Sequence, residues 1–139
     1  MDYSVYINEH KELYQKLEYF LLEFTKLKNK RDDEFLILRS KELYSYLEGL
    51  LNEHFKEEEQ KLFPEIKDQL EQEIYDKITG DHDEIRAKFA SLKTKMQAFE
   101  TNRELDYKTE LLFPTYNLIA TISHHAQRED KYIFEVELV

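Results

Sequence analysis

The sequence predicts an all-α protein, an up-down-up-down antiparallel four-helix bundle. Its 139 residues include only 2 Gly and 2 Pro, so few positions favour turns over helix. Four stretches carry apolar residues at the spacing of an amphipathic helix, and short polar links separate them. Because short links join antiparallel neighbours, we expect a single domain that spans residues 1–139.

The first two helices are expected at 4–29 and 33–63. In the first, apolar residues recur with helical spacing as far as Phe24, and a polar run follows from Lys28. In the second, a leucine-rich stripe continues up to Pro64. Because a proline pushes the preceding residue out of the α region, the second helix should stop or kink there.

The third and fourth helices follow the same apolar periodicity. The third is expected at 71–100, with Gly80 tolerated inside it at about 1 kcal/mol relative to Ala. The fourth ends at 136 and begins at either 106 or 114, because Pro114 suits a first helical turn as well as a kink. Both starts remain open at the level of the sequence.

The charge balance and the lack of cysteine exclude several classes of function. The formal net charge of -10 argues against nucleic acid or an anionic membrane as the main partner, because both are bound through clustered Lys and Arg. Without cysteine, any metal must be held by nitrogen and oxygen ligands. The first residues lack the features of a signal peptide and no stretch reaches the length of a membrane span, so we expect a cytoplasmic protein.

One pattern of metal-ligand type occurs twice in the chain. His54 is followed after four residues by Glu58, and His125 is followed after four residues by Glu129. A phenylalanine stands nine residues after each histidine. Residues four apart share a helix face, so each segment directs an imidazole and a carboxylate to the same side.

Two further histidines complete a weak internal repeat. His10 and His82 lie on the apolar stripes of the first and third helices, and each precedes a histidine of the repeated pattern, by 44 and 43 residues. All these groups fall at one level of the bundle and point inward, where such a set is costly unless metal ions compensate it. The predicted ligands of two metal ions are His10, His54, Glu58, His82, His125 and Glu129.

Neighbouring polar residues fit the centre less well. His124 points roughly 100° away from His125, so we expect it at the surface or flanking the site. Asp130 lies off the inward face of an ideal helix, whereas Glu129 is in phase, and both remain candidates for the last carboxylate. A tyrosine near the ions, either Tyr6 or Tyr14, is a further interpretation, but no sequence pattern supports it.

These segments resemble the hemerythrin-like (HHE cation-binding) domain family. The resemblance rests on His10, the segment from His54 to Pro64, His82 and the segment from His125 to Asp130, and it spans nearly the whole chain. Members of that family are four-helix bundles that hold a non-haem di-iron centre, bridged by carboxylates and an oxo or hydroxo group. The resemblance therefore implies two iron ions at the predicted site.

The chain departs from the oxygen-carrying hemerythrins at two places. Those proteins have a further histidine one turn before the position of His82, where this chain has Ile78. Their last carboxylate follows its histidine by five residues, which gives Asp130, whereas repair and sensor relatives use four, which gives Glu129. The internal repeat favours Glu129, and the set of four histidines and two carboxylates is similar to that of the relatives implicated in iron-centre repair and in iron or oxygen sensing.

Three functions follow from these expectations. The first is a di-iron protein that binds or reacts with oxygen, nitric oxide or peroxide, in the response to oxidative or nitrosative stress. The second is an iron or oxygen sensor that acts through a protein partner. The third is a redox-inert zinc or manganese site, since histidine and carboxylate ligands suit several metals. A turnover enzyme is less favoured, because no further acid-base pair or substrate-binding motif is visible.

Overall fold

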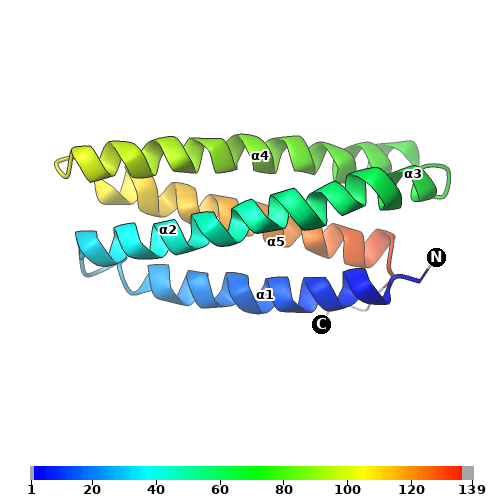
Figure 1. Cartoon of the computed structure of the whole chain (residues 1–139), viewed down its shortest axis with the longest axis horizontal. Helices are drawn as coiled ribbons and strands as arrows, with labels where there is room; N and C mark the ends of the chain where they lie inside the picture. Colours follow the sequence, from blue (N-terminus) through cyan, green and yellow to red (C-terminus); the bar gives the residue numbers. More distant parts are fainter. Residues whose placement is uncertain (1, 136–139) are drawn as a thin grey trace.

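The computed structural model describes residues 2–135, which form four long helical stretches (Figure 1). In chain order the elements are α1 (Ser4–Thr25), α2 (Asp33–Leu50), the π-helical segments η1 (Leu51–Phe55) and η2 (Glu58–Leu62), α3 (Phe63–Ile66), α4 (Gln72–Thr101), the π-helical segment η3 (Lys108–Leu112) and α5 (Phe113–Tyr132). The second stretch runs from α2 to α3, and the fourth joins η3 to α5. No strand occurs within residues 2–135, so the predicted all-α class is confirmed.

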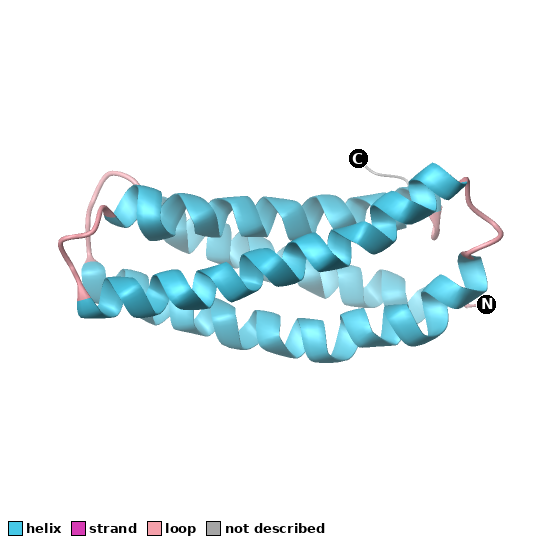
Figure 2. Cartoon of the chain, turned by 90° about the horizontal axis from the view of Figure 1, so that it is seen from above, coloured by secondary structure: helices cyan, strands magenta, loops and turns pink. Residues whose placement is uncertain are grey.

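The four stretches lie side by side along the long axis of the molecule. Following the colours of Figure 1, the chain reverses direction between one stretch and the next, and Figure 2 shows the connecting loops gathered at the two ends. α1 packs against α2 and α5, and α4 packs against the same two helices. The four stretches therefore surround a common interior. None of the helices in residues 2–135 contains an apolar stretch that could span a membrane.

The first helix is shorter than the predicted 4–29. Regular α-helix ends at Thr25, and the N–H groups of Leu27 and Lys28 then donate to carbonyls only three residues back, at 3.0 and 3.1 Å. Such bonds tighten the chain into turns. Leu27 is the last buried residue of this stretch, so the polar residues after it have no apolar face to keep against the core.

The second stretch runs through Pro64, where the sequence predicts a stop or a kink near 63. The helix continues to Ile66, and the Phe63 N–H donates to the carbonyl of Glu58, five residues back. In a regular α-helix the proline ring clashes with the carbonyl four residues back. The wider π turn shifts this bonding by one residue, which lets the helix pass the proline.

Pro114 is accommodated in the same way in the fourth stretch. The N–H of Phe113 donates to the carbonyl of Lys108, again five residues back. Because η3 precedes the proline, the helix begins near the earlier of its two predicted starts. It ends at Tyr132, short of the predicted 136, which lies outside the described residues. α4 begins and ends within one residue of the predicted third helix.

Two apolar clusters fill the interior. The larger, here called the main core, extends over most of the length and includes Leu13, Phe55, Ile85 and Ala126. The smaller, here called the end cluster, consists of Tyr6, Leu62, Phe63, Ile66, Ile78, Ile133 and Phe134. On every stretch, the predicted metal ligands lie in the sequence between residues of the end cluster and residues of the main core. Polar side chains therefore occupy the level between the two clusters.

Candidate metal centre

Six buried side chains from all four helical stretches meet at this level. They are His10 of α1, His54 of η1, Glu58 of η2, His82 of α4, and His125 and Glu129 of α5. None is more than 6% exposed. These are the six residues that the sequence predicts as metal ligands, and the structure brings all of them together.

The six residues divide into two groups that share their carboxylates. One group contains His10 and His54, and the other contains His82 and His125. Glu58 and Glu129 belong to both. Within each group the candidate ligand atoms all lie within 4.8 Å of one another. The donor set thus has the form of two adjacent cation sites with common carboxylates.

Glu58 faces both groups. One of its carboxylate oxygens lies 3.3 Å from Nε2 of His54, and the other lies 3.0 Å from Nε2 of His82. Nε2 of His82 and Nε2 of His125 are 3.1 Å apart. Two nitrogen donors from neighbouring helices therefore converge on one place.

Glu129 repeats this arrangement from the other half of the chain. Its Oε1 lies 3.2 Å from Nε2 of His10 and 3.4 Å from Nε2 of His125. Among the described residues, both oxygens of Glu129, Oε2 of Glu58 and Nε2 of His10 are buried without a hydrogen-bond partner. Buried polar atoms normally have partners. These unpaired buried atoms belong to the clustered residues and fit a bound cation.

The second ring nitrogen of each histidine contacts a different carboxylate. Nδ1 of His10 lies 2.6 Å from Oδ1 of Asp130, and Nδ1 of His82 lies 2.6 Å from Oε2 of Glu59. The corresponding partner of His54 is Glu9, at 2.5 Å, and that of His125 is Asp81, at 3.1 Å. Metal-binding histidines usually donate their second N–H in this way. If Nδ1 donates, Nε2 keeps a free lone pair toward the cluster.

Burial and charge act in opposite directions on the pKa values of His10 and His54. Burial alone lowers the pKa of His10, but the carboxylates of Asp130 and Glu129 raise that pKa to about 9. Burial likewise lowers the pKa of His54, and the carboxylate of Glu58 raises it to about 8. Without a metal ion, the raised pKa values favour the protonated form of His10 and His54 at neutral pH. A cation that binds here must displace these protons.

A comparison with protein families matches this geometry to a known domain. The family model described as the hemerythrin HHE cation binding domain matches residues 1–136. The chain belongs to this family. Comparisons with curated proteins and with solved structures found no match. Membership agrees with the buried histidine and glutamate cluster and indicates that the domain binds a metal cation.

Two expectations about flanking residues of this HHE domain can now be compared with the structure. His124 is exposed and belongs to neither group, as expected for a surface residue. Asp130 also belongs to neither group, but it is only 3% exposed. Its carboxylate contacts His10 of α1 rather than the shared carboxylates, because α1 packs against this face of α5.

Tyr14 extends the contacts of Asp130 toward the surface. Its hydroxyl donates to Oδ2 of Asp130, at 2.5 Å, while Oδ1 of the same carboxylate contacts His10. Burial, together with this hydrogen bond to Asp130, raises the pKa of Tyr14. Tyr14 therefore lies two contacts away from the cluster. Tyr6 belongs to the end cluster, with its ring centroid 6.3 Å from that of His54.

The carboxylates behind the histidines are functional candidates. The sequence prediction missed Glu9, Glu59 and Asp81, and it considered Asp130 only as an alternative to Glu129 as a metal ligand. Glu9 and Asp81 each come directly before a lone histidine, and Glu59 and Asp130 each come directly after a glutamate of the repeated pattern. Glu9 and Asp81 contact the second histidine of their own half, whereas Glu59 and Asp130 contact the lone histidine of the other half. The internal repeat was the one signal that could have revealed them.

Both predicted ligands from the second stretch lie in π-helical segments. His54 is in η1 and Glu58 begins η2. π turns are rare and frequently occur at functional sites, because the extra residue re-aims the side chains. At this level the wider turns set how the imidazole and the carboxylate of the same stretch face the cluster.

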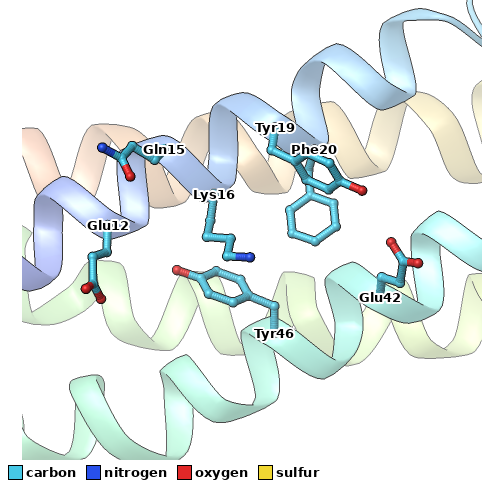
Figure 3. Close-up of a pocket in the computed structure, with 7 residues that line it drawn as sticks. All are labelled: Glu12, Gln15, Lys16, Tyr19, Phe20, Glu42 and Tyr46. Atoms are coloured by element: carbon cyan, nitrogen blue, oxygen red, sulfur yellow. The ribbon is translucent and has the colours of Figure 1, made fainter.

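Two open depressions lie between α1 and α2. Figure 3 shows the first, of about 820 Å³, which is lined by Glu12, Gln15, Lys16, Tyr19, Phe20, Glu42 and Tyr46. A second, of about 630 Å³, shares Glu12 and Tyr46 with the first and extends to His54. Gly49 lines it, and a Cβ at that position would meet nothing within 4 Å. The surface is therefore hollowed next to His54, one of the predicted metal ligands.

Proposed function

We propose that this chain is a non-haem di-iron protein that binds or reacts with oxygen, nitric oxide or peroxide, in an up-down-up-down antiparallel four-helix bundle. The observation that carries the proposal is the pair of four-residue groups that share Glu58 and Glu129. Two adjacent sites with common carboxylates are suited to two ions held close together. Iron, rather than another metal, is the expectation from the family.

In this proposal each residue has a defined task. His10 and His54 would hold one ion, and His82 and His125 would hold the other, while both groups would share Glu58 and Glu129. When bound, two iron ions supply redox and Lewis-acid chemistry for a small diatomic ligand or peroxide. The carboxylates behind the rings fix their orientation and make the imidazoles better donors.

The surroundings of His82 favour an open position for an external ligand. One turn before His82, at the place where oxygen carriers have a histidine, Ile78 is fully buried in the end cluster. The ring of Phe63 packs against that of His82, with centroids 4.9 Å apart. The ion at His82 and His125 would therefore have fewer protein ligands than in the oxygen carriers, next to an apolar wall. This favours exchange or reaction with a small ligand over reversible carriage.

Metal analysis of two matched variants tests the proposal. We expect the aerobically purified protein to hold about two irons per chain and to show charge-transfer absorption in the visible range. The isosteric Glu58→Gln, Glu129→Gln double variant should lose both, because it removes the two shared negative charges. The exposed pair Glu73→Gln, Glu104→Gln serves as the control and should retain both.

Circular dichroism of the three proteins must show the same helix content for the comparison to hold. Iron that is retained in full by the Glu58→Gln, Glu129→Gln variant would refute the centre. Zinc or manganese at full occupancy, without visible absorption, would instead favour the redox-inert alternative.

A sensing role through a protein partner is the second candidate. Its supporting observation is that ligands from all four stretches meet between the two apolar clusters, so that an empty site leaves unpaired polar atoms between them. Metal binding should then order the contact between the stretches. Limited proteolysis separates the roles: a sensor should become markedly more resistant on loading with metal, whereas equal resistance of both forms would argue against sensing.

A further inference from the structure

The residues that surround the two groups of ligands carry very different charge. We infer that the two metal positions differ in affinity, and that the position of His10 and His54 fills before that of His82 and His125. The inference rests on the proposed metal centre and goes beyond it, because the ligand sets themselves are equivalent. The difference comes from the second layer of contacts.

Behind His82 and His125, basic side chains neutralise the outer carboxylates. Arg86 contacts both oxygens of Glu59, at 2.5 and 3.0 Å. Arg128 donates to Oδ2 of Asp81 through Nε at 2.9 Å, and its Nη2 lies 2.8 Å from the same oxygen. Nζ of Lys77 lies 3.1 Å from Oδ1 of Asp81. Two carboxylates are thus opposed by three cations.

Behind His10 and His54, no basic side chain within the described residues neutralises the outer carboxylates of Glu9 and Asp130. Asp130 receives its second hydrogen bond from the neutral hydroxyl of Tyr14. Glu9 has His54 as its partner, and within residues 2–135 neither Glu9 nor Asp130 pairs with a Lys or Arg. The two carboxylates on this side therefore keep their negative charge uncompensated by a basic residue.

The internal repeat shows that the difference is built into equivalent positions. Arg86 stands four residues after His82, and Tyr14 stands four residues after His10. The residue three positions after the histidine of the repeated pattern is Arg128 in the second half and Glu57 in the first, where its partner is the exposed Lys61. In place of Lys77, five residues before its histidine, the first half has Val5. All three cations are thus missing from the first half.

The charge difference sets the direction of the effect. A cation is attracted more strongly by neighbouring carboxylates when no other cation compensates them. A carboxylate that no cation compensates also polarises the imidazole N–H more, which strengthens the opposite nitrogen as a donor. The second depression between α1 and α2, which is lined by Glu9, Glu53 and Glu57, also adjoins His54. The metal position of His10 and His54 therefore lies next to a negatively charged surface.

A stepwise titration with Zn²⁺, read at the histidine rings, tests this inference. Long-range ¹H–¹⁵N correlation spectra separate the five imidazoles of the chain. Up to one equivalent, we expect the resonances of His10 and His54 to move while those of His82 and His125 stay in place. Changes to the residues that contact metal ligands typically alter metal affinity by about 10- to 100-fold. We therefore expect the affinities of the two binding steps to differ by at least about tenfold.

The basic residues themselves provide the matched variants. The Arg86→Gln, Arg128→Gln double variant should bring the two steps together, with the affinity ratio reduced by about tenfold. The Arg31→Gln, Arg103→Gln pair, whose ionic partners are Asp33 and Glu34, should leave the ratio unchanged.

Parallel movement of all four rings in the unmodified protein, or movement of His82 and His125 first, would overturn the inference and leave the metal centre standing. Failure of two equivalents of Zn²⁺ to move any of the four rings would count against the proposed metal centre itself.

Discussion

Each histidine of the centre uses both of its ring nitrogens. In His10, for example, Nδ1 contacts Asp130 while Nε2 faces Glu129 across 3.2 Å. The outer carboxylate thereby fixes the rotation of the ring before any ion arrives. A centre arranged in this way loses little freedom on binding metal, because the donor atoms already converge.

The protonation of these rings predicts how the stability of the metal-free protein depends on pH. In the folded state the pKa of His10 is raised to about 9 and that of His54 to about 8, against about 6.5 for an unperturbed histidine. A raised pKa stabilises the folded state below about pH 6.5, and this contribution is lost as the pH rises through 8 and 9. We therefore expect the free energy of unfolding to fall between pH 6.5 and 9.

Urea denaturation of the metal-free protein at several pH values measures this change. The metal-loaded protein is the control, and it should show little loss over the same range because the ion takes the place of the protons. A metal-free protein that becomes more stable toward pH 9 would contradict the assigned contacts of these two histidines.

The sequence predicts the six inward residues but not their outer partners. The six lie on apolar stripes, so helical periodicity alone places them inside. Asp130 lies about 100° from Glu129 on an ideal helix and thus faces a neighbouring helix instead of the centre. Its partner His10 stands 120 positions away in the chain. Such a contact depends on which helices are neighbours, and periodicity does not contain that information.

At the scale of elements, the bounds of the third helix were predictable, whereas the ends of the other stretches and the π turns were not. Apolar stripes located α4 to within one residue, whereas Pro64 was read as a stop or a kink. Both prolines follow a Leu-Phe pair, and in both cases that phenylalanine bonds five residues back. A proline after an apolar pair can therefore continue a buried helix when a wider turn precedes it.

Gly80 offers a test of helix stability that is independent of the metal site. It lies inside α4, it is exposed, and a Cβ there would meet nothing within 4 Å. Because glycine loses more backbone freedom than alanine on forming a helix, Gly80→Ala should raise the free energy of unfolding by about 0.5–1 kcal/mol. Chemical denaturation measures the gain, with metal content unchanged. A destabilised variant would show that α4 bends or packs differently at this point.

At the scale of the whole molecule, most of the buried polar side chains lie in one layer. The layer consists of His10, His54, Glu58, Asp81, His82, His125, Glu129 and Asp130. The main core lies on one side of it and the end cluster on the other. Such a layer contributes little hydrophobic stabilisation of its own, so the contact between the two sides depends on hydrogen bonds, charge and the bound ions.

This division of the interior bears on how the molecule opens. The end cluster is small and holds together the terminal parts of all four stretches, including Tyr6, Ile66, Ile78 and Phe134. Without ions, this end should open repeatedly while the main core stays folded, as a separate cooperative unit. Amide hydrogen exchange would then be fast at one end of the molecule and slow at the other. Occupied metal positions would join the two units, so that the ends of the helices exchange only when the whole chain unfolds.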